Sequence, residues 1–167
     1  MLELAQYRDP WMAEQFDEWI GFYTREFYCL DNFSSFQIEY NGVLYTTVEE
    51  AYQALGFIDS APEVYEKILN SRSAHEAKKI AHEYKEQRRP DWESVKVSIM
   101  AELLRAKVEQ HPYVRKKLLE TKNYPLVEDS PVDSFYGCGL ELNGQNVLGK
   151  LWEKLRTELQ IKEEIAD

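Results

Sequence analysis

The sequence predicts an α+β fold: a compact, mostly helical single domain with a small antiparallel sheet. Residues 36–40 and 43–45 alternate apolar and polar side chains around Asn41-Gly42, a pair that favours a two-residue hairpin turn. After the hairpin, apolar residues recur at helical spacing in successive segments as far as residue 159. No internal repeat and no interdomain linker interrupts these segments, so we expect one domain.

The chain before the hairpin contributes one strand. Residues 1–18 are acidic and place Trp11, Met12 and Phe16 along one helical face, so we expect an N-terminal accessory segment there. Residues 19–23 are rich in aromatic side chains and predict a short buried strand, and residues 27–36 predict a loop. The main domain is expected over residues 19–160, followed by a charged tail at 161–167 that frays.

The predicted helices begin at recognisable signals. Ser73 and Glu76 have the spacing of a capping box, and Asp91 and Asn146 are favourable N-cap residues. Pro62 stands where a proline suits the first helical turn. Helices are therefore expected to start near residues 46, 61, 73, 92, 111 and 146, the longest spanning 92–110, with a further strand over 124–128.

Composition excludes several classes of function. The formal charge of −10 argues against stable binding to a nucleic-acid backbone or an anionic membrane. Cys29 and Cys138 have neither zinc-site nor disulfide-framework spacing, and no His-x-x-His, Ser-His-Asp or Walker pattern is present. We therefore expect a cytoplasmic protein with free thiols, no metal and no cofactor. The sequence leaves the oligomeric state open.

The helix that follows the hairpin carries the first candidate site. Glu49, Gln53 and Gly56 lie at i, i+4 and i+7, which puts a carboxylate, an amide and a bare backbone position on one stripe. Such a stripe suits a pocket wall in which the carboxylate moves a proton or stabilises positive charge. The alternative is a capping role, because Thr46 and Glu49 also have capping-box spacing, as do Thr47 and Glu50.

Two lysines fall on the inward side of the longest predicted helix. Counting 100° per residue from Trp92, Lys96 and Lys107 lie inside the apolar arc. Buried lysines are costly unless they are paired, so one alternative is that each extends to the rim or pairs with a carboxylate such as Glu128. The alternative is an amine in a cleft that holds phosphate or attacks a sugar aldehyde.

The loop over residues 133–144 and the helix after it carry the remaining candidates. Asp133, Tyr136 and Gly137 combine an acid, an aromatic ring and a glycine that either lets a ligand approach or serves a surface turn. Asn146 and Gly149 put a cap and a missing side chain in a first helical turn, which favours either simple capping or anion binding.

Taken in order, these segments resemble the NADAR family, the YbiA-like N-glycosidases. The resemblance covers roughly residues 20–159 and rests on Leu30-Asp31-Asn32-Phe33, Glu49 with Tyr52-Gln53-Ala54 and Phe57, Trp92-Glu93-Ser94-Val95-Lys96 with Met100, Arg105-Ala106-Lys107, Leu126-Val127-Glu128, Asp133 with Tyr136-Gly137, and Gly144-x-Asn146-x-Leu148-Gly149 followed by Arg156. It implies a compact α+β fold with a pocket for a phosphorylated N-ribosyl ligand. The reaction it implies is hydrolysis of an N-glycosidic bond, in a riboflavin-pathway intermediate or in an ADP-ribosylated base.

The resemblance also implies roles for the candidate residues. Glu49 would stabilise the positive charge that builds on the sugar, with Asp133 or Glu128 as a second acid or base. Lys96 or Lys107 would bind phosphate or trap the opened sugar. The substrate-binding set would be Asn32, Phe33, Tyr52, Gln53, Trp92, Glu128, Tyr136, Gly137, Asn146 and Gly149. The alternative function is a nucleotide- or ADP-ribose-binding sensor that keeps the pocket without turnover.

The sequence departs from the family pattern at four places. Gly56 stands where members usually carry lysine, Ala81-His82 replaces Gly-Arg, Asp31 replaces serine, and Tyr136 replaces tryptophan. Two explanations for Gly56 remain: it lies near a helix C-terminus, where glycine is common, or it leaves room for a bulkier ligand.

Overall fold

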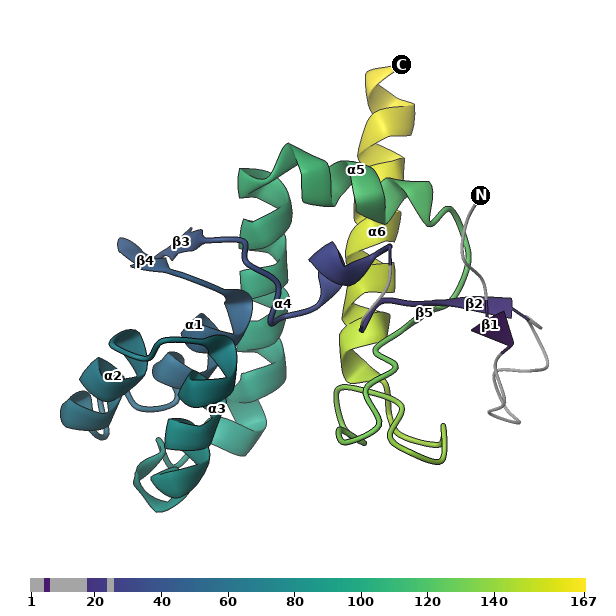
Figure 1. Ribbon diagram of the computed structural model, residues 1–167. Coiled ribbons are helices and arrows are strands. Elements are labelled where there is room, and N and C mark those ends of the chain that lie inside the picture. Colours follow the sequence, from purple (N-terminus) through teal and green to yellow (C-terminus); the bar gives the residue numbers. More distant parts are fainter. Residues whose placement is uncertain (1–4, 7–17, 24–25) are drawn as a thin grey trace. The chain divides into compact units, whose positions relative to one another are not determined.

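The computed structural model describes residues 5–6, 18–23 and 26–167 (Figure 1). Most of the predicted accessory segment, including the helical face around Trp11, lies outside the described residues. Contacts divide the chain into two compact units: unit 1 comprises residues 1–31 and 112–167, and unit 2 comprises residues 32–111. The sequence, which shows no interdomain linker, gives no sign of this division.

Unit 2 opens with the predicted hairpin. Strand β3 (Ile38–Tyr40) pairs antiparallel with β4 (Val43–Tyr45), and Ile38 lies opposite Tyr45. Asn41 has φ 50° and Gly42 has φ 79°, the two left-handed positions that a type I′ turn requires. The hairpin turn is therefore confirmed, and its second strand leads directly into the first helix.

The rest of unit 2 is helical. Its α-helices are α1 (Val48–Leu55), α2 (Pro62–Leu69), α3 (Ala74–Glu83) and α4 (Trp92–Gln110). Helix α1 contacts each of the other three (Figure 1). All eight residues of α1 are buried, including Glu49, Glu50 and Gln53. Buried polar side chains need hydrogen-bond partners inside the protein, so the surroundings of α1 must supply them.

The capping signals have mixed outcomes. Thr47 Oγ1 accepts the backbone N–H of Glu50 at 3.0 Å, and Ser73 Oγ accepts that of Glu76 at 3.1 Å, as expected for N-caps. Asp91 occupies the N-cap position of α4 but its side chain makes no capping bond. Its carboxylate accepts hydrogen bonds from Arg89 instead, and this competing ion pair explains why the predicted cap is wrong.

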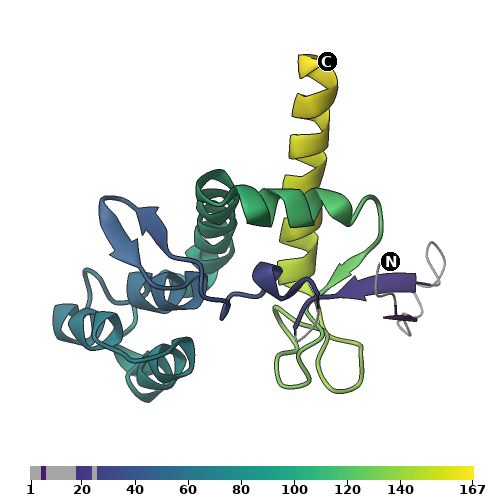
Figure 2. The same cartoon turned by 45° about the horizontal axis from the view of Figure 1, so that its top comes forward.

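Unit 1 combines a small sheet with two helices. Its elements are β1 (Ala5–Gln6), β2 (Glu18–Gly21), a 3-10 turn (Tyr28–Leu30), α5 (Pro112–Glu120), β5 (Leu126–Val127) and α6 (Val147–Ala166). Strand β2 pairs antiparallel with β1 and parallel with β5, where Ile20 lies opposite Leu126. Helix α5 crosses α6 (Figures 1 and 2). The indole N–H of Trp152 donates to the Leu30 carbonyl at 2.9 Å, which fixes the 3-10 turn onto α6.

The predicted α+β class is confirmed, with a parallel strand pair in addition to the predicted antiparallel hairpin. Helix α6 continues to Ala166 and so includes most of the charged tail expected at residues 161–167. Cys29 and Cys138 are both free and buried. No helix among the described residues is long and apolar enough to cross a membrane.

Candidate functional site

The predicted site residues are divided between the two units. Unit 2 holds Asn32, Phe33, Glu49, Tyr52, Gln53, Trp92, Lys96 and Lys107, and unit 1 holds Glu128, Asp133, Tyr136, Gly137, Asn146 and Gly149. Polar contacts gather some of these residues into one cluster in each unit. We call them the Glu49 cluster (Asn32, Glu49, Gln53 and Arg88) and the Glu128 cluster (Asp31, Glu128, Asp133 and Asn146).

The two neighbouring glutamates of α1 have different partners. Glu50 serves the helix start, because its carboxylate accepts hydrogen bonds from the backbone N–H and the hydroxyl group of Thr46. Glu49 is the preceding residue and points to a different side of the helix, where its Oε1 accepts a hydrogen bond from the Gln53 amide at 2.7 Å. The capping bond of α1 is therefore the one from the Glu50 N–H to Thr47 Oγ1, with the Glu50 carboxylate bound to Thr46. The Glu49 carboxylate is instead hydrogen-bonded to Gln53, one helical turn later.

Arg88, which precedes α4, completes this stripe. Its Nη2 donates to Gln53 Oε1 at 3.2 Å, while Gln53 Nε2 donates to Glu49. Burial lowers the pKa of the Arg88 guanidinium, and the nearby charges, including Glu49, oppose that shift. The sequence predicts a helix start near residue 92 and assigns no role to Arg88. No local pattern could have placed Arg88 beside α1, because that contact depends on how the chain turns between α3 and α4.

Asn32 borders the same cluster and has an incomplete set of hydrogen bonds. Its backbone carbonyl accepts the N–H of Glu49 at 3.1 Å, and its Nδ2 contacts Met100 Sδ at 3.4 Å. The side chain is 5% exposed, yet its Oδ1 has no hydrogen-bond partner among the described residues. A buried acceptor in this state is costly, which is why such atoms often mark the place of a ligand or water.

The aromatic candidates of unit 2 contact other side chains. The Phe33 ring stacks on His75 with centroids 4.6 Å apart, and the Lys78 ammonium lies 5.8 Å from the Phe33 centroid. The rings of Tyr52 and Trp92 are 4.9 Å apart, and both side chains are buried. Ring faces that were expected to line a ligand are thus at least partly covered by the protein itself.

The two lysines of α4 differ in their surroundings. Lys107 is 0% exposed, its Nζ donates to Ser34 Oγ at 2.8 Å, and it lies 5.2 Å from the Phe36 centroid. Its inward direction is confirmed, but a fully buried amine cannot meet a sugar aldehyde in this arrangement. Lys96 pairs with Glu93 of its own helix at 2.5 Å, which agrees with the expected alternative of pairing with a carboxylate, and its place in a cleft stays a prediction.

In unit 1, Asn146 holds the strand β5 rather than capping α6. It occupies the N-cap position with φ 51° and makes no capping bond. Its Oδ1 accepts the Glu128 N–H at 3.0 Å and its Nδ2 donates to the Leu126 carbonyl at 2.9 Å. Asn146 has the predicted N-cap position, but the capping hydrogen bond is absent because the oxygen and the nitrogen of its side-chain amide are both bonded to backbone groups at the end of β5.

The Glu128 carboxyl lies among other acids. Burial raises the pKa of Glu128 well above its ordinary value, and a hydrogen bond with Asp31 together with the charge of Asp31 adds to that shift. The carboxyl is 5% exposed, and its Oε1 has no hydrogen-bond partner in the part of the chain described. Among those same residues, no group of three His, Cys, Asp or Glu side chains could hold a metal ion. The raised pKa keeps the Glu128 carboxyl protonated at neutral pH.

This protonation predicts a stability effect. Unfolding returns Glu128 to its ordinary pKa, so the folded protein holds a proton that the unfolded chain releases, and stability falls as pH rises above that ordinary value. Glu128→Gln removes this penalty and keeps a donor for Asp31. We expect the variant to be more stable by about 1–3 kcal/mol at pH 8, with a smaller difference at pH 5. Thermal unfolding across this range measures the difference, and parallel curves for the two proteins would contradict the assignment.

Asp133 and two of the glycines shape the loop in which they lie. Asp133 Oδ1 accepts the backbone N–H groups of Phe135 and Tyr136 at 2.9 and 2.8 Å, as in a side-chain-stabilised turn. A Cβ at Gly137 would lie 2.7 Å from the Asp133 carbonyl oxygen. A Cβ at Gly149 would lie 2.0 Å from a backbone carbonyl oxygen of β5. The space expected for a ligand beside these glycines is taken by the chain itself.

Comparisons with known proteins identify the family to which this chain belongs. The NADAR domain matches residues 20–160. The chain is 36% identical to an N-glycosidase of Nostoc punctiforme over 133 residues, covering 79% of this chain and 85% of that protein. It is 34% identical to the riboflavin biosynthesis protein PYRR of Zea mays over 90% of this chain, but only 27% of that longer protein is covered.

The third comparison is structural. The NMR structure of the Escherichia coli protein YbiA, which is named as an N-glycosidase, superposes with a TM-score of 0.77 at 34% identity and covers 86% of each chain. The family match spans most of the chain, and these relatives share its sequence over most of its length. The chain therefore belongs to the NADAR family.

Proposed function

We propose that this protein is an N-glycosidase that hydrolyses the ribosyl C1′–N bond of a phosphorylated N-ribosyl compound. Two kinds of support converge on this reaction. The relatives from Nostoc punctiforme and Escherichia coli are named as N-glycosidases. The Glu49 cluster supplies a buried carboxylate whose position is set by hydrogen bonds to its own helix.

The chemistry of C1′–N cleavage gives that carboxylate its role. As the bond breaks, positive charge builds on the sugar ring, and a fixed carboxylate beside the ring stabilises this charge. The same carboxylate can accept a proton from the attacking water. In this proposal Glu49 performs both tasks, and the hydrogen bond from Gln53 to Glu49 Oε1 holds the carboxylate in position.

The observation that carries the proposal is the unpartnered Oδ1 of Asn32. It is buried, it accepts but cannot donate, and the backbone of the same residue binds the N–H of Glu49. A ribose hydroxyl or a base N–H group would supply the missing donor. A substrate bound in this way would be oriented next to the proposed catalytic carboxylate.

Covalent catalysis by lysine is not part of the proposal. A Schiff base requires the amine to reach the sugar C1′, and Lys107 is 0% exposed while Lys96 is paired with Glu93. Direct attack by water, activated by Glu49, needs no such movement of the chain.

For the substrate, we propose the riboflavin-pathway intermediates first and ADP-ribosylated bases second. The relative from Zea mays is named as a riboflavin biosynthesis protein, which favours the first class. Both classes present a phosphorylated ribose joined to nitrogen, which is the bond that the Glu49 cluster would act upon.

The test is a panel of N-ribosylated nucleotides incubated with the protein, with release of the free base followed by mass spectrometry. We expect release from at least one phosphorylated member, at a rate proportional to protein concentration. Binding without release, measured by calorimetry on the same panel, would instead identify a nucleotide-binding sensor. Neither binding nor release from any member would contradict both functions.

A further inference from the structure

Gly56 follows directly after α1 and its backbone does not explain why it is glycine. Its φ of −68° suits any residue, so the positive φ of a glycine cap is absent. A Cβ built there would lie 3.0 Å from Arg88 Cγ and 3.4 Å from Arg88 Cδ. The missing side chain thus makes room for the stem of Arg88. Gly56 lies at the C-terminus of α1 as one sequence explanation expected, though without a positive φ, and the explanation by a bulkier ligand stays a prediction.

The guanidinium group of Arg88 lies over two aromatic rings. The group lies 5.5 Å from the Phe57 ring centroid and 5.6 Å from that of Trp92. The backbone N–H of the next residue, Arg89, donates to the Gly56 carbonyl at 2.8 Å and fixes the segment onto the end of α1. Two aromatic contacts and a backbone anchor therefore determine where the positive charge lies.

Donor and acceptor chemistry then orients the Gln53 amide. Arginine has only donors, so the end of Gln53 that meets Arg88 must be its oxygen. The Nε2 group is left to face Glu49, and a carboxylate has only acceptors to offer it. The three side chains therefore agree in one arrangement, and without Arg88 the Gln53 amide loses one of the two partners that hold it in place.

We infer that Arg88 is a positioning residue of the Glu49 cluster: it sets the Gln53 amide and through it the Glu49 carboxylate, and Gly56 is the residue that admits it. This inference rests on the proposed function for its catalytic part. Its packing part is that the Arg88 side chain needs residue 56 to have no Cβ, and this part does not depend on whether the protein is an enzyme.

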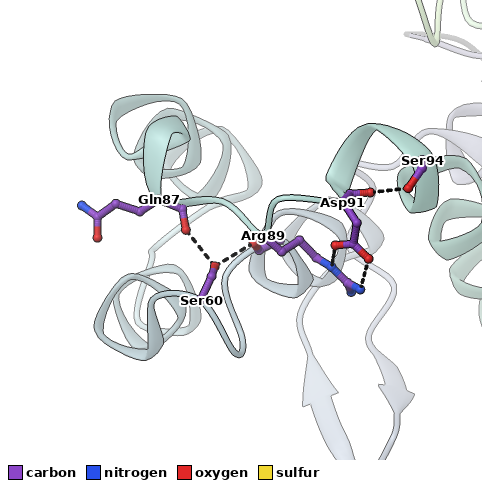
Figure 3. Close-up of polar contacts among 6 residues, drawn as sticks. Ser60, Gln87, Arg89, Asp91 and Ser94 are labelled. Atoms are coloured by element: carbon purple, nitrogen blue, oxygen red, sulfur yellow. Dashed lines mark hydrogen bonds and ion pairs between the residues drawn. The ribbon is translucent and has the colours of Figure 1, made fainter.

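The catalytic part is tested with Arg88→Met, which keeps the apolar stem and removes the guanidinium group. We expect kcat to fall about 10-fold or more, because a misplaced catalytic group costs that much, while KM changes less than about 2-fold. Arg89→Met is the matched control. Figure 3 shows the Arg89 side chain paired with Asp91, where Nε and Asp91 Oδ1 are 2.6 Å apart, so its loss leaves the Glu49 cluster intact.

Chemical rescue separates positioning from a general loss of structure. Guanidinium ion, at a concentration that leaves the wild-type Tm unchanged, should restore part of the kcat lost in Arg88→Ala and none in Glu49→Gln. Three results would overturn the catalytic part: wild-type kcat in Arg88→Met, a failure of guanidinium to rescue, or a rise in KM at unchanged kcat. The last of these would show that Arg88 binds the substrate itself.

The packing part is tested by a thermal-unfolding cycle on the wild type, Gly56→Ala, Arg88→Ala and the double variant. Gly56→Ala should lower Tm by about 2–4 °C in the wild type, because its Cβ meets the Arg88 stem. In the Arg88→Ala background the same change should leave Tm level or raise it. Equal shifts in both backgrounds would refute the packing part, whereas absence of base release by the wild type would refute only the proposed function.

Discussion

Glu49→Gln should reduce base release by about 100-fold or more, with little change in Tm. The substitution removes the negative charge that stabilises the sugar cation and accepts the proton of water. It keeps the side-chain oxygen that accepts the Gln53 amide, so the local structure is retained. The rate constant is measured under single-turnover conditions, and Tm by calorimetry on the same preparation.

Glu50→Ala is the matched control for this prediction, because the two glutamates are adjacent and both are buried. It removes the contacts of Glu50 with Thr46 at the helix start, which should lower stability by about 1 kcal/mol. The rate per folded molecule should stay near that of the wild type. A fully active Glu49→Gln, or an equal loss of rate in both variants, would remove Glu49 from the catalytic role.

Gly149→Ala should destabilise the protein by about 3 kcal/mol or more. On an open helix surface the same change would stabilise by about 0.5–1 kcal/mol, since alanine is the better helix former. Here the new Cβ would lie 2.0 Å from the Leu126 carbonyl oxygen and 2.5 Å from the Asn146 side-chain amide. Steric overlap with a backbone group outweighs propensity, so the sign of the effect reverses.

Denaturant unfolding of Gly149→Ala, compared with Lys150→Ala, measures this effect. Lys150 is the next residue of α6 and is exposed, so its replacement should change stability by no more than about 0.5 kcal/mol. A Gly149→Ala variant as stable as the wild type would mean that β5 and the start of α6 are separated more widely than in this structure.

Local signals in the sequence were sufficient for most of the secondary structure. Asn41-Gly42 specifies its own turn, because both residues tolerate a positive φ and the flanking side chains alternate. Helix α4 begins at Trp92 and ends at Gln110 as predicted, because its apolar spacing continues until His111-Pro112 interrupts it, although α6 rather than α4 is the longest helix described. In each case the determining interactions lie within a few residues.

The features that sequence reasoning missed depend on residues far apart in the chain. The parallel pairing of Ile20 with Leu126 has no local signal, because each strand is short and the paired residues are buried. Asn146 was expected to cap its own helix, but two backbone groups near β5 compete for its amide. Arg88 was missed for the same reason, because its partner Gln53 lies 35 residues earlier in the chain.

The Glu49 cluster was predicted in part. Glu49 and Gln53 share a helical stripe, so their contact follows from spacing alone, and Asn32 was among the substrate-binding candidates. The direction of the Gln53 amide could not be predicted, because it depends on a cation supplied by another segment. The burial of Lys107 was foreseen from helical geometry, but its degree of exposure depends on Ser34 and the packed chain around it.

The division of the chain has a consequence for the order in which the protein forms during synthesis. Unit 2 is one continuous segment, so all its contacts can form once His111 has left the ribosome. Unit 1 must wait, because β2 pairs with β5 across about 100 residues of chain, and closing so long a loop costs entropy. If unit 2 has already folded, the effective loop is shorter. The inserted segment thereby accelerates the assembly of the segments on either side of it.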